Sequence, residues 1–440
     1  MTRCASAPTI AAVGETGRRG WHPTCWLGAP SPGGLALPAA QPTASQLYAP
    51  RGVWLDDERL VVCDSGNHRV LIWHGVPHDD QAAADVVLGQ ASFTAEGPAA
   101  AGRGTGNGLH LPTGVIVVEG RLFVADAWHH RILVWNSVPV ESDTPPDWCL
   151  GQPSLHDVER NRGGDVMAHS LYWPYGIAWI AGRFHVADTG NRRLLIWNGL
   201  PDRDRPADVV LGQPDTQSAA ENRGGPPGPN SFRWPHAIAG SAERLFVADA
   251  GDHRVLSWAG RPDADTPADL VLGQPDFATT AELPHRPQGA GRLRFPYGVA
   301  VVDDLLAVAD TANNRVLLWQ LPLAATVAAP ADDVLGQDDF DSSGENRWRA
   351  VTPDSLCWPY GLCLHRGADG ATQLAIADSG NNRVMIYGAG EAPMRLQAPM
   401  RKQGDSAASI PKQPESSPGS RLGACMKRGS RGLRCMKRGA

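Results

Sequence analysis

The stretch Val186 to Leu195 reads VADTGNRRLL, and Ile376 to Met385 reads IADSGNNRVM. Each stretch ends an apolar run on Asp, passes through a Gly-Asn turn, and reaches Arg five residues after the Asp, where a second apolar run leads to an aromatic residue. This Asp/Arg unit occurs six times, at steps of 62, 62, 61, 61 and 68 residues. The pairs are Asp64/Arg69, Asp126/Arg131, Asp188/Arg193, Asp249/Arg254, Asp310/Arg315 and Asp378/Arg383. A nearly constant step of this length is the sequence signature of a repeat architecture.

Two other short motifs keep the same period. A Pro-x-Gly motif, once Pro-x-Ala, precedes each Asp, and Leu-Gly-Gln follows the aromatic residue in five repeats. Each unit therefore holds four short apolar runs, which we name a to d, and examples of runs a, b and d are Gly298–Val302, Leu245–Asp249 and Asp208–Gly212. Short runs rich in β-branched or aromatic residues and bounded by Gly, Asn, Asp or Pro predict strands. Six units of four antiparallel strands predict an all-β, six-bladed β-propeller. A β-sandwich is the structural alternative, but it would not require six equal periods.

The N-terminal region supplies the strand that the last repeat lacks. That repeat ends at Tyr387 with no Leu-Gly-Gln run after it, whereas Cys25–Pro30 (CWLGAP) matches Trp148–Pro153 (WCLGQP). We therefore expect residues 24–29 to form strand d of a blade built from residues 352–388. Such an N-terminal strand closes the ring and removes two exposed sheet edges.

The repeats define one domain with two flanking segments. We predict a propeller over residues 21–388, a disordered N-terminal segment over 1–20 and a disordered basic tail over 389–440. The tail is rich in Pro, Gly, Ser and basic residues and holds CMKRG twice, at 425–429 and 435–439. A composition of this kind cannot bury a core, so a solvated tail is the favoured interpretation and a tether to an anionic surface is the alternative.

Charge and cysteine usage narrow the classes of function. The tail carries 11 basic and 3 acidic residues, so residues 1–388 hold a formal charge of −14 within a chain of net charge −6. An acidic body disfavours nucleic-acid binding, which needs a basic face. None of the eight cysteines forms a CxxC pair, so zinc-ribbon, RING and thioredoxin-like motifs are unsupported. No secretory signal is evident and no apolar run approaches the ~18 residues of a membrane span, so we expect a cytoplasmic protein.

The motifs VADTGNRRLL and IADSGNNRVM resemble NHL repeats, and VLGQPDF at Val271–Phe277 resembles a string that recurs in bacterial proteins of NHL type. The resemblance spans residues 21–388 and implies a six-bladed propeller. NHL-like propellers include interaction and RNA-binding modules of tripartite-motif proteins, which sit beside a RING that this chain does not show. They also resemble amidating lyases and lactonases that use a metal in the central channel.

The favoured interpretation is a non-catalytic NHL-type scaffold that binds a protein or peptide, or a small ligand, and requires no cofactor. The alternative is a metal-dependent enzyme, a lyase or a lactonase-like hydrolase, with Ca or Zn in the central channel. We assign no catalytic residue, because beyond His236 and the tyrosines that share its repeat position no non-repeated cluster of Asp, Glu, Asn or His is found.

Residues that recur in every repeat are interpreted as scaffold, and positions that vary between repeats are candidates for the site. The six Asp/Arg pairs recur in every repeat, whereas an active site needs its residues once, so we interpret them as structural ion pairs with a Gly-Asn turn that supplies positive φ. The aromatic residue that ends each strand c is interpreted as core. Four aromatic residues directly precede the Pro of their repeats, and we expect them to pack blade against blade: Trp173, Trp234, Phe295 and Trp358.

The variable position of the Pro-x-Gly motif is the candidate ligand-binding site. It is occupied by Arg51, Thr113, Tyr175, His236, Tyr297 and Tyr360. Because this position begins each innermost strand, we expect these side chains to ring the channel mouth, on the face that also carries the long d–a connections. Polar tips on aromatic bodies suit ligand capture, and one asymmetric site requires blades that differ.

Two further features of the sequence are an Asn-Arg motif in three of the long connections and a b–c turn that departs from the repeat. Three long connections carry Asn-Arg at matching places, at Asn161-Arg162, Asn222-Arg223 and Asn346-Arg347. In Asp126–Arg131 (DAWHHR), Trp-His replaces Gly-Asn, and two histidines beside an aspartate suggest a metal site. Since His68, His130 and His253 share one repeat position, a blade-surface role is the favoured interpretation of His130.

Overall fold

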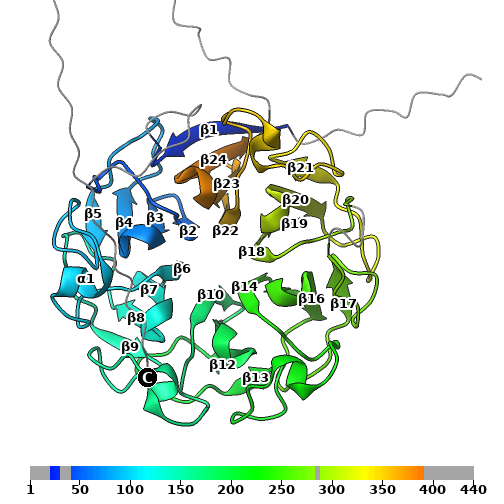
Figure 1. The fold of residues 1–440 in the computed structure, drawn as a ribbon, viewed down its shortest axis with the longest axis horizontal. Coiled ribbons are helices and arrows are strands. Elements are labelled where there is room, and N and C mark those ends of the chain that lie inside the picture. The colour runs from blue at the N-terminus through cyan, green and yellow to red at the C-terminus, as the bar shows by residue number, and fades with distance from the viewer. Residues whose placement is uncertain (1–19, 30–40, 283–287, 391–440) are drawn as a thin grey trace, which may run out of the picture. The chain divides into compact units, whose positions relative to one another are not determined.

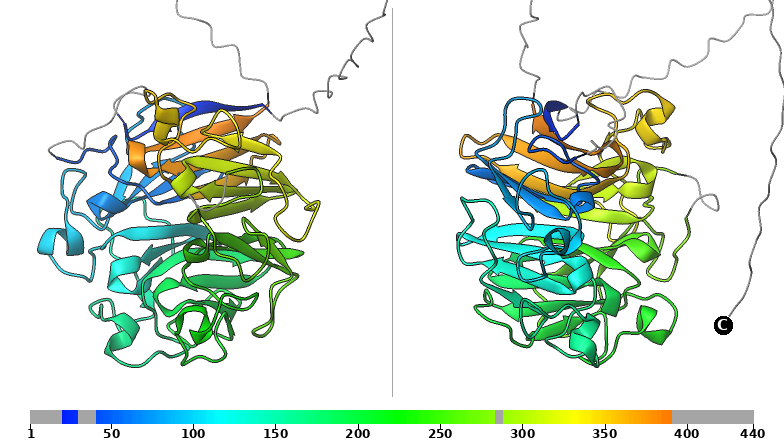
Figure 2. Two further views of the ribbon diagram at one scale, coloured as in Figure 1. Left: turned by 45° about the vertical axis from the view of Figure 1, so that its right-hand side comes forward. Right: turned by 60° about the vertical axis from the view of Figure 1, so that its left-hand side comes forward.

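The computed structural model describes residues 20–29, 41–282 and 288–390, and these form a closed ring of six four-stranded antiparallel sheets (Figure 1). The innermost strand of each blade follows the long d–a connection, and the next two strands lie outward in chain order (Figure 1). The views in Figure 2 show the blades following one another with their sheets face to face. The predicted six-bladed propeller is confirmed. Within the described residues, no helix is long and apolar enough to cross a membrane.

The strands are short and follow one another blade by blade. They are β2 (Gly52–Leu55), β3 (Arg59–Asp64), β4 (Arg69–His74) and β5 (Val86–Leu88) in the first blade; β6 (Pro112–Val118), β7 (Arg121–Asp126), β8 (Arg131–Trp135) and β9 (Trp148–Leu150) in the second; β10 (Pro174–Ile180), β11 (Arg183–Asp188), β12 (Arg193–Asn198) and β13 (Val209–Leu211) in the third; β14 (Pro235–Gly240), β15 (Arg244–Asp249), β16 (Arg254–Ala259) and β17 (Leu270–Leu272) in the fourth; β18 (Pro296–Val302), β19 (Leu305–Asp310), β20 (Arg315–Gln320) and β21 (Asp333–Leu335) in the fifth; and β22 (Pro359–Arg366), β23 (Thr372–Asp378), β24 (Arg383–Ala389) and β1 (Trp21–Leu27) in the sixth.

The N-terminal strand closes the ring, as the sequence predicted. Strand β1 pairs antiparallel with β24, in a register that joins Cys25 to Ile386 and Leu27 to Val384. The strand begins at Trp21 rather than near residue 24, and β24 continues to Ala389. The first and last parts of the propeller are therefore held in one sheet, and the outer edge of β24 is covered.

The core lies between neighbouring sheets, because each sheet presents apolar side chains to both of its neighbours. Six buried clusters alternate with the blades, and each draws residues from two adjacent sheets. The aromatic residues that end the c strands are all buried, namely Trp73, Trp135, Trp197, Trp258, Trp319 and Tyr387. The indole nitrogens of the five tryptophans donate to carbonyls of the c–d loops, as from Trp135 Nε1 to Thr144 O at 3.0 Å. These positions are core, as predicted.

The turn between strands b and c has a different geometry from the one expected. Asp64 is followed by the 3₁₀ turn Ser65–Asn67 and then by His68, whose φ is 54°. The prediction that the Gly-Asn pair itself supplies positive φ is wrong, since the residue directly before the Arg does so in every blade. Two blades carry His129 or Asp252 in place of the Asn. Gly66 is required for space instead, because a Cβ atom there would collide with the backbone and ring of Tyr48.

The described residues give the extent of the propeller strands but do not test the predicted domain boundaries. The propeller strands begin at Trp21 and end at Ala389, one residue beyond the predicted limit. The predicted disorder of 1–20 and of 389–440 concerns segments that, apart from residues 20, 389 and 390, lie outside the described residues. The disorder of both segments stays a prediction.

Candidate functional site

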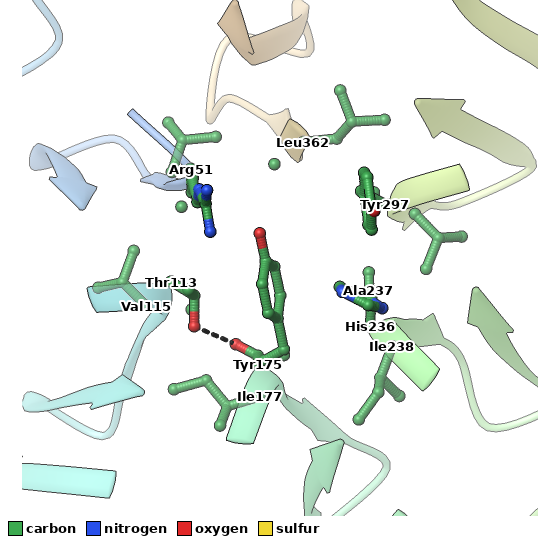
Figure 3. Close-up of a pocket in the computed structure, with 17 residues that line it drawn as sticks. Arg51, Thr113, Val115, Tyr175, Ile177, His236, Ala237, Ile238, Tyr297 and Leu362 are labelled. Atoms are coloured by element: carbon green, nitrogen blue, oxygen red, sulfur yellow. Dashed lines mark hydrogen bonds between the residues drawn. The ribbon is translucent and has the colours of Figure 1, made fainter. Parts of the chain in front are cut away.

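The channel mouth is built by the first residues of the six innermost strands. At Pro-x-Gly, the inner strands approach so closely that a Cβ atom on Gly176 would collide with the carbonyl oxygen of His236 in the next blade, and the same holds between Gly298 and Tyr360. The glycine is therefore a packing requirement of the ring, and it fixes the preceding side chain at the mouth. Thr113 adds a direct bond between blades, with its Oγ1 donating to Tyr175 O at 3.0 Å (Figure 3).

The six predicted site residues come together around the mouth. The rings of Tyr297 and Tyr360 stack with centroids 4.8 Å apart, and His236 lies between Tyr175 and Tyr297 with centroid distances of 4.3 and 4.5 Å. The Arg51 guanidinium lies over the Tyr360 ring, 5.1 Å from its centroid. Tyr175, His236 and Thr113 are buried, so the mouth is nearly closed by its own side chains.

A small cavity of about 80 Å³ lies within this ring (Figure 3). Its other walls come from the residue three positions after each Pro, which is aliphatic in all six blades: Val53, Val115, Ile177, Ile238, Val299 and Leu362. Sequence reasoning did not single out this aliphatic ring. The sequence signal for this ring is the β-branched or leucine residue that occupies that position in every repeat, which is also typical of ordinary strands.

The cavity carries one positive charge. His236 Nδ1 lies 2.9 Å from Trp234 O, and since a carbonyl cannot donate, Nδ1 carries the proton and Nε2 is free to accept. Burial lowers the pKa of His236 to about 3, so this imidazole is neutral at physiological pH. Burial raises the pKa of Tyr297 to about 12 and that of Tyr175 still further, so both phenols stay protonated. The pKa of the Arg51 guanidinium is raised, chiefly by the neighbouring Tyr175 phenol, so it remains a cation.

Aromatic side chains surround the mouth on the long-loop face, by which we mean the face formed by the d–a loops and the b–c turns. Trp173, Trp234 and Phe295 are half-buried and Trp358 is 41% exposed. Ring contacts support the prediction that these residues pack blade against blade, because Trp234 stacks on Phe295 of the next blade with centroids 6.3 Å apart and Trp173 lies 6.2 Å from His236 of the next blade. For Trp358 it stays a prediction. Trp128, from the b–c turn that departs from the repeat, is 50% exposed and lies 6.5 Å from Trp173 between ring centroids. We call these five residues the aromatic belt.

The backbone before each Pro is held by the preceding blade. Five of the six residues at this position have φ between 45° and 52°, a region that bulky residues rarely adopt. The N–H of Phe295 donates to His253 Nδ1 at 3.1 Å, and that of Trp358 donates to Asn314 Oδ1 at 2.9 Å. The exception is Trp234, because Arg192 occupies the acceptor position and offers no lone pair. There the N–H of Trp234 donates to Asp249 Oδ1 at 2.9 Å.

The histidines at this repeat position are parts of the scaffold. His130 is half-buried and its Nδ1 lies 3.1 Å from the Trp173 backbone nitrogen, so it bridges blades and the blade-surface interpretation is wrong. Its neighbour His129 is buried and pairs with Asp126, with Nδ1 2.8 Å from Oδ2. Within the described residues, no group of three or more His, Cys, Asp or Glu side chains is arranged to hold a metal ion.

The Asp/Arg pairs lie away from the channel and form one repeated network. Asp64 Oδ2 accepts from Arg69 Nε at 2.7 Å and from Asn67 Nδ2 at 2.8 Å, and its Oδ1 accepts from the Tyr48 N–H at 2.7 Å. The other arginine nitrogens donate to loop carbonyls, including Phe93 O at 2.6 Å. All twelve side chains of the six pairs are 0% exposed. In the first five blades, each pair ties strands b and c to the d–a loops on either side of its blade.

The Asn-Arg motifs also brace the long loops. Asn161 is 8% exposed and its Nδ2 donates to Asn191 Oδ1 in the b–c turn at 3.1 Å, and Asn346 and Asn381 repeat the arrangement at 3.0 Å. Arg162 forms an ion pair with Asp204 at 2.6 Å. These side chains are engaged by the scaffold, so they do not extend the candidate site.

Comparisons with known proteins add little beyond this architecture. No protein-family model matches the chain, and no curated protein matches it. Among solved structures, it is similar to a chain in the crystal structure of a nidogen/laminin complex, at 15% identity over 71% of this chain and 84% of that chain, with a TM-score of 0.37. It is also similar to Chaetomium thermophilum Raptor, at 11% identity over 85% of this chain and 29% of that chain, with a TM-score of 0.42. The chain is identified by its own strand topology, as a six-bladed β-propeller of four-stranded antiparallel blades.

Proposed function

We propose that this protein is a non-catalytic propeller of NHL type that binds a protein or peptide partner through its long-loop face. The observation that carries the proposal is the aromatic belt around a mouth that the chain itself nearly closes. Trp128 and Trp358 expose 50% and 41% of their surface there. Exposed aromatic side chains next to arginines are typical of the energetic centres of protein interfaces.

The dimensions favour a macromolecular partner over a small ligand held in the channel. Pockets for small molecules usually measure ~300–1,000 Å³. The mouth encloses about 80 Å³, which accommodates one functional group of a larger partner. The belt offers contact area outside the cavity, and Arg233 stacks on Trp234 with its guanidinium 5.2 Å from the ring centroid. A segment that lies across the belt would therefore contact several blades at once.

The NHL type and the cellular location are part of the same proposal. The repeated Asp/Arg network and the Gly-Asn turn support the NHL assignment. Cys25, Cys63, Cys149, Cys357 and Cys363 are free and buried, and free thiols persist in the reducing cytoplasm.

The test compares two exposed apolar positions on opposite faces. Trp128→Ser with Trp358→Ser removes the exposed part of the belt, and Val140→Ser is the control, because Val140 is 73% exposed in a c–d loop. That loop lies by the a–b turn, since Val138 N donates to Gly120 O at 3.0 Å. A partner identified by cross-linking and purified should bind the double variant at least ~10-fold more weakly than wild type, as loss of an aromatic anchor predicts. The control should bind within ~2-fold of wild type. Equal binding by the double variant, or loss in the control alone, would refute the proposal.

A further inference from the structure

We propose that the cavity at the channel mouth binds a single carboxylate group through the Arg51 guanidinium and the Tyr175 hydroxyl. The inference rests on the proposed function, since it names the chemistry that a partner of the long-loop face presents to the channel. Two neighbouring features of the cavity carry it, a cation without a carboxylate partner among the described residues and a buried hydroxyl without an acceptor.

Arg51 is the cation, and it differs from the arginines of the scaffold. Arg69 and its five equivalents each have a carboxylate partner within 3.0 Å and are 0% exposed. Arg51 is half-buried and stacks on Tyr360, but no described carboxylate lies within ion-pair distance of its guanidinium. Removing a cation from water is unfavourable unless an anion and hydrogen-bond acceptors replace the lost solvent. A guanidinium carries five N–H donors in a planar fork that matches a carboxylate.

Tyr175 provides the second feature. The residue is 5% exposed and its hydroxyl is buried beside the Arg51 guanidinium, which can only donate, so within the described residues the hydroxyl hydrogen has no acceptor. Figure 3 shows the hydroxyl directed to the centre of the ring, with Arg51 on one side and Tyr297 on the other. A buried hydroxyl without an acceptor costs about 1–3 kcal/mol, so its retention in the apolar channel indicates an acceptor that comes from outside the chain.

Charge and size select a carboxylate from among the oxyanions. His236 is neutral, because burial holds its pKa near 3, so Arg51 supplies the one positive charge of the cavity. A monoanion balances that charge, whereas a phosphate dianion would leave a negative charge facing the aliphatic ring of Val53, Ile177 and Ile238. The volume of about 80 Å³ fits a carboxylate on a short carbon stem. Water occupies ~30 Å³ per molecule in the liquid, so this space replaces only a few waters.

The variants are chosen so that the ring still closes. Arg51→Thr places at this position the residue that the second blade uses at Thr113, and Tyr175→Phe removes only the hydroxyl. Arg203→Thr is the charge-matched control, because the Arg203 side chain is 76% exposed and its one ion pair within the described residues, with Asp202, is 4.0 Å long. The melting temperatures of all three variants without added anion check that they fold.

The probes are sodium acetate, N-acetylglycine, N-acetylglycinamide and inorganic phosphate, titrated calorimetrically at pH 7 and constant ionic strength. Wild type should bind N-acetylglycine, and its amide should not bind. The Kd should rise at least ~10-fold in Arg51→Thr, as loss of a charge-assisted pair predicts, and ~3-fold or more in Tyr175→Phe. Arg203→Thr should bind like wild type. Acetate binding as tightly as N-acetylglycine would identify a free small carboxylate as the source, and preference for N-acetylglycine would identify the end of a peptide.

Three results would overturn the inference. They are unchanged binding of N-acetylglycine by Arg51→Thr, binding of the amide as tight as that of the acid, and tighter binding of phosphate than of either carboxylate. Because the titration needs no partner, it fails separately from the proposed function. An intact carboxylate site with full partner binding by the Trp128/Trp358 double variant would refute only the proposed function.

Discussion

Single residues at the mouth combine scaffold and recognition chemistry. The backbone at the x position packs against the glycine of a neighbouring blade, as that of His236 does against Gly176, while the side chain is free to vary. This separation explains how one blade can carry Arg51 and another Thr113 in the same fold. It also predicts that the Tyr175 hydroxyl, which has no acceptor among the described residues, contributes little to stability, unlike the Thr113 hydroxyl, which donates to Tyr175 O at 3.0 Å.

Tyr175→Phe tests that separation in the absence of ligand. The free energy of unfolding should stay within ~0.5 kcal/mol of wild type or rise, because the hydroxyl that is lost has no acceptor among the described residues. The matched control is Tyr387→Phe, whose hydroxyl donates to Pro353 O at 3.2 Å and whose loss should cost ~1 kcal/mol. Urea denaturation of both variants gives the comparison. A larger loss at Tyr175 than at Tyr387 would show that the Tyr175 hydroxyl belongs to the scaffold.

His253 gives the chain a defined sensitivity to acid. It is 4% exposed, it accepts the Phe295 N–H, and burial lowers its pKa to about 4. Glu282 lies 3.9 Å away and acts in the opposite direction, to raise that pKa. Below the unfolded pKa of ~6.5 the unfolded chain binds more protons at this site than the folded chain, so stability falls as the pH drops from 6.5 toward 4.

His253→Asn should reduce this loss, because Asn is the natural acceptor at the equivalent Asn314 and Asn382. Between pH 7 and pH 5 the variant should lose ~1 kcal/mol less unfolding free energy than wild type, measured by urea denaturation at both pH values. His78→Asn, at an exposed position, should behave as wild type. An unchanged difference between the two pH values in His253→Asn would contradict the assignment.

At the scale of elements, the strand exchange makes the sixth blade equivalent to the others. Leu27 in β1 and Leu150 in β9 are 0% and 1% exposed, and both occupy the Leu-Gly position of strand d. If β1 works as an ordinary outer strand, Leu27→Ala and Leu150→Ala should destabilise the protein similarly, by ~2–4 kcal/mol each. Chemical denaturation measures both. A negligible effect at Leu27 beside a large one at Leu150 would mean that β1 does not hold the ring closed.

The sequence predicted the parts of the structure that repeat and missed those that depend on contacts between blades. The period, the four strands and the pairing of Leu27 with the last blade followed from motif spacing. The sequence predicts positive φ in the Gly-Asn pair, whereas His68 adopts it. The reason for Gly66 is instead the contact with Tyr48, which leaves no room for a Cβ atom and is a tertiary property. The exposure of Trp358 was missed for the same reason, since its backbone is held by Asn314 of the preceding blade.

For the candidate site, the sequence predicted which residues occupy the x position of Pro-x-Gly and that they gather at the channel mouth. It did not predict how buried, how apolar or how charged the mouth is. Three features depend on the closed ring. Tyr175 and His236 are buried, a ring of aliphatic residues lies with them, and Arg51 has no carboxylate partner among the described residues. No single repeat contains that information.

At the scale of the whole molecule, the six blades form a rigid ring with one distinctive face. The Asp/Arg network and the glycines of Pro-x-Gly repeat around it, whereas the belt and the cavity do not. Asymmetry on a symmetric scaffold is what recognition of one partner requires, since one ligand cannot contact six identical blades equally. We therefore propose the long-loop face as the place where a partner binds.

Hydroxyl-radical footprinting of the protein with and without its purified partner tests most directly whether the partner binds the long-loop face. Trp128 and Trp358 are exposed on the long-loop face, and Val140 is exposed on the other side of the ring. The account predicts that the partner protects both tryptophans from oxidation and leaves the oxidation of Val140 unchanged. Protection of Val140 with both tryptophans still fully reactive would contradict it.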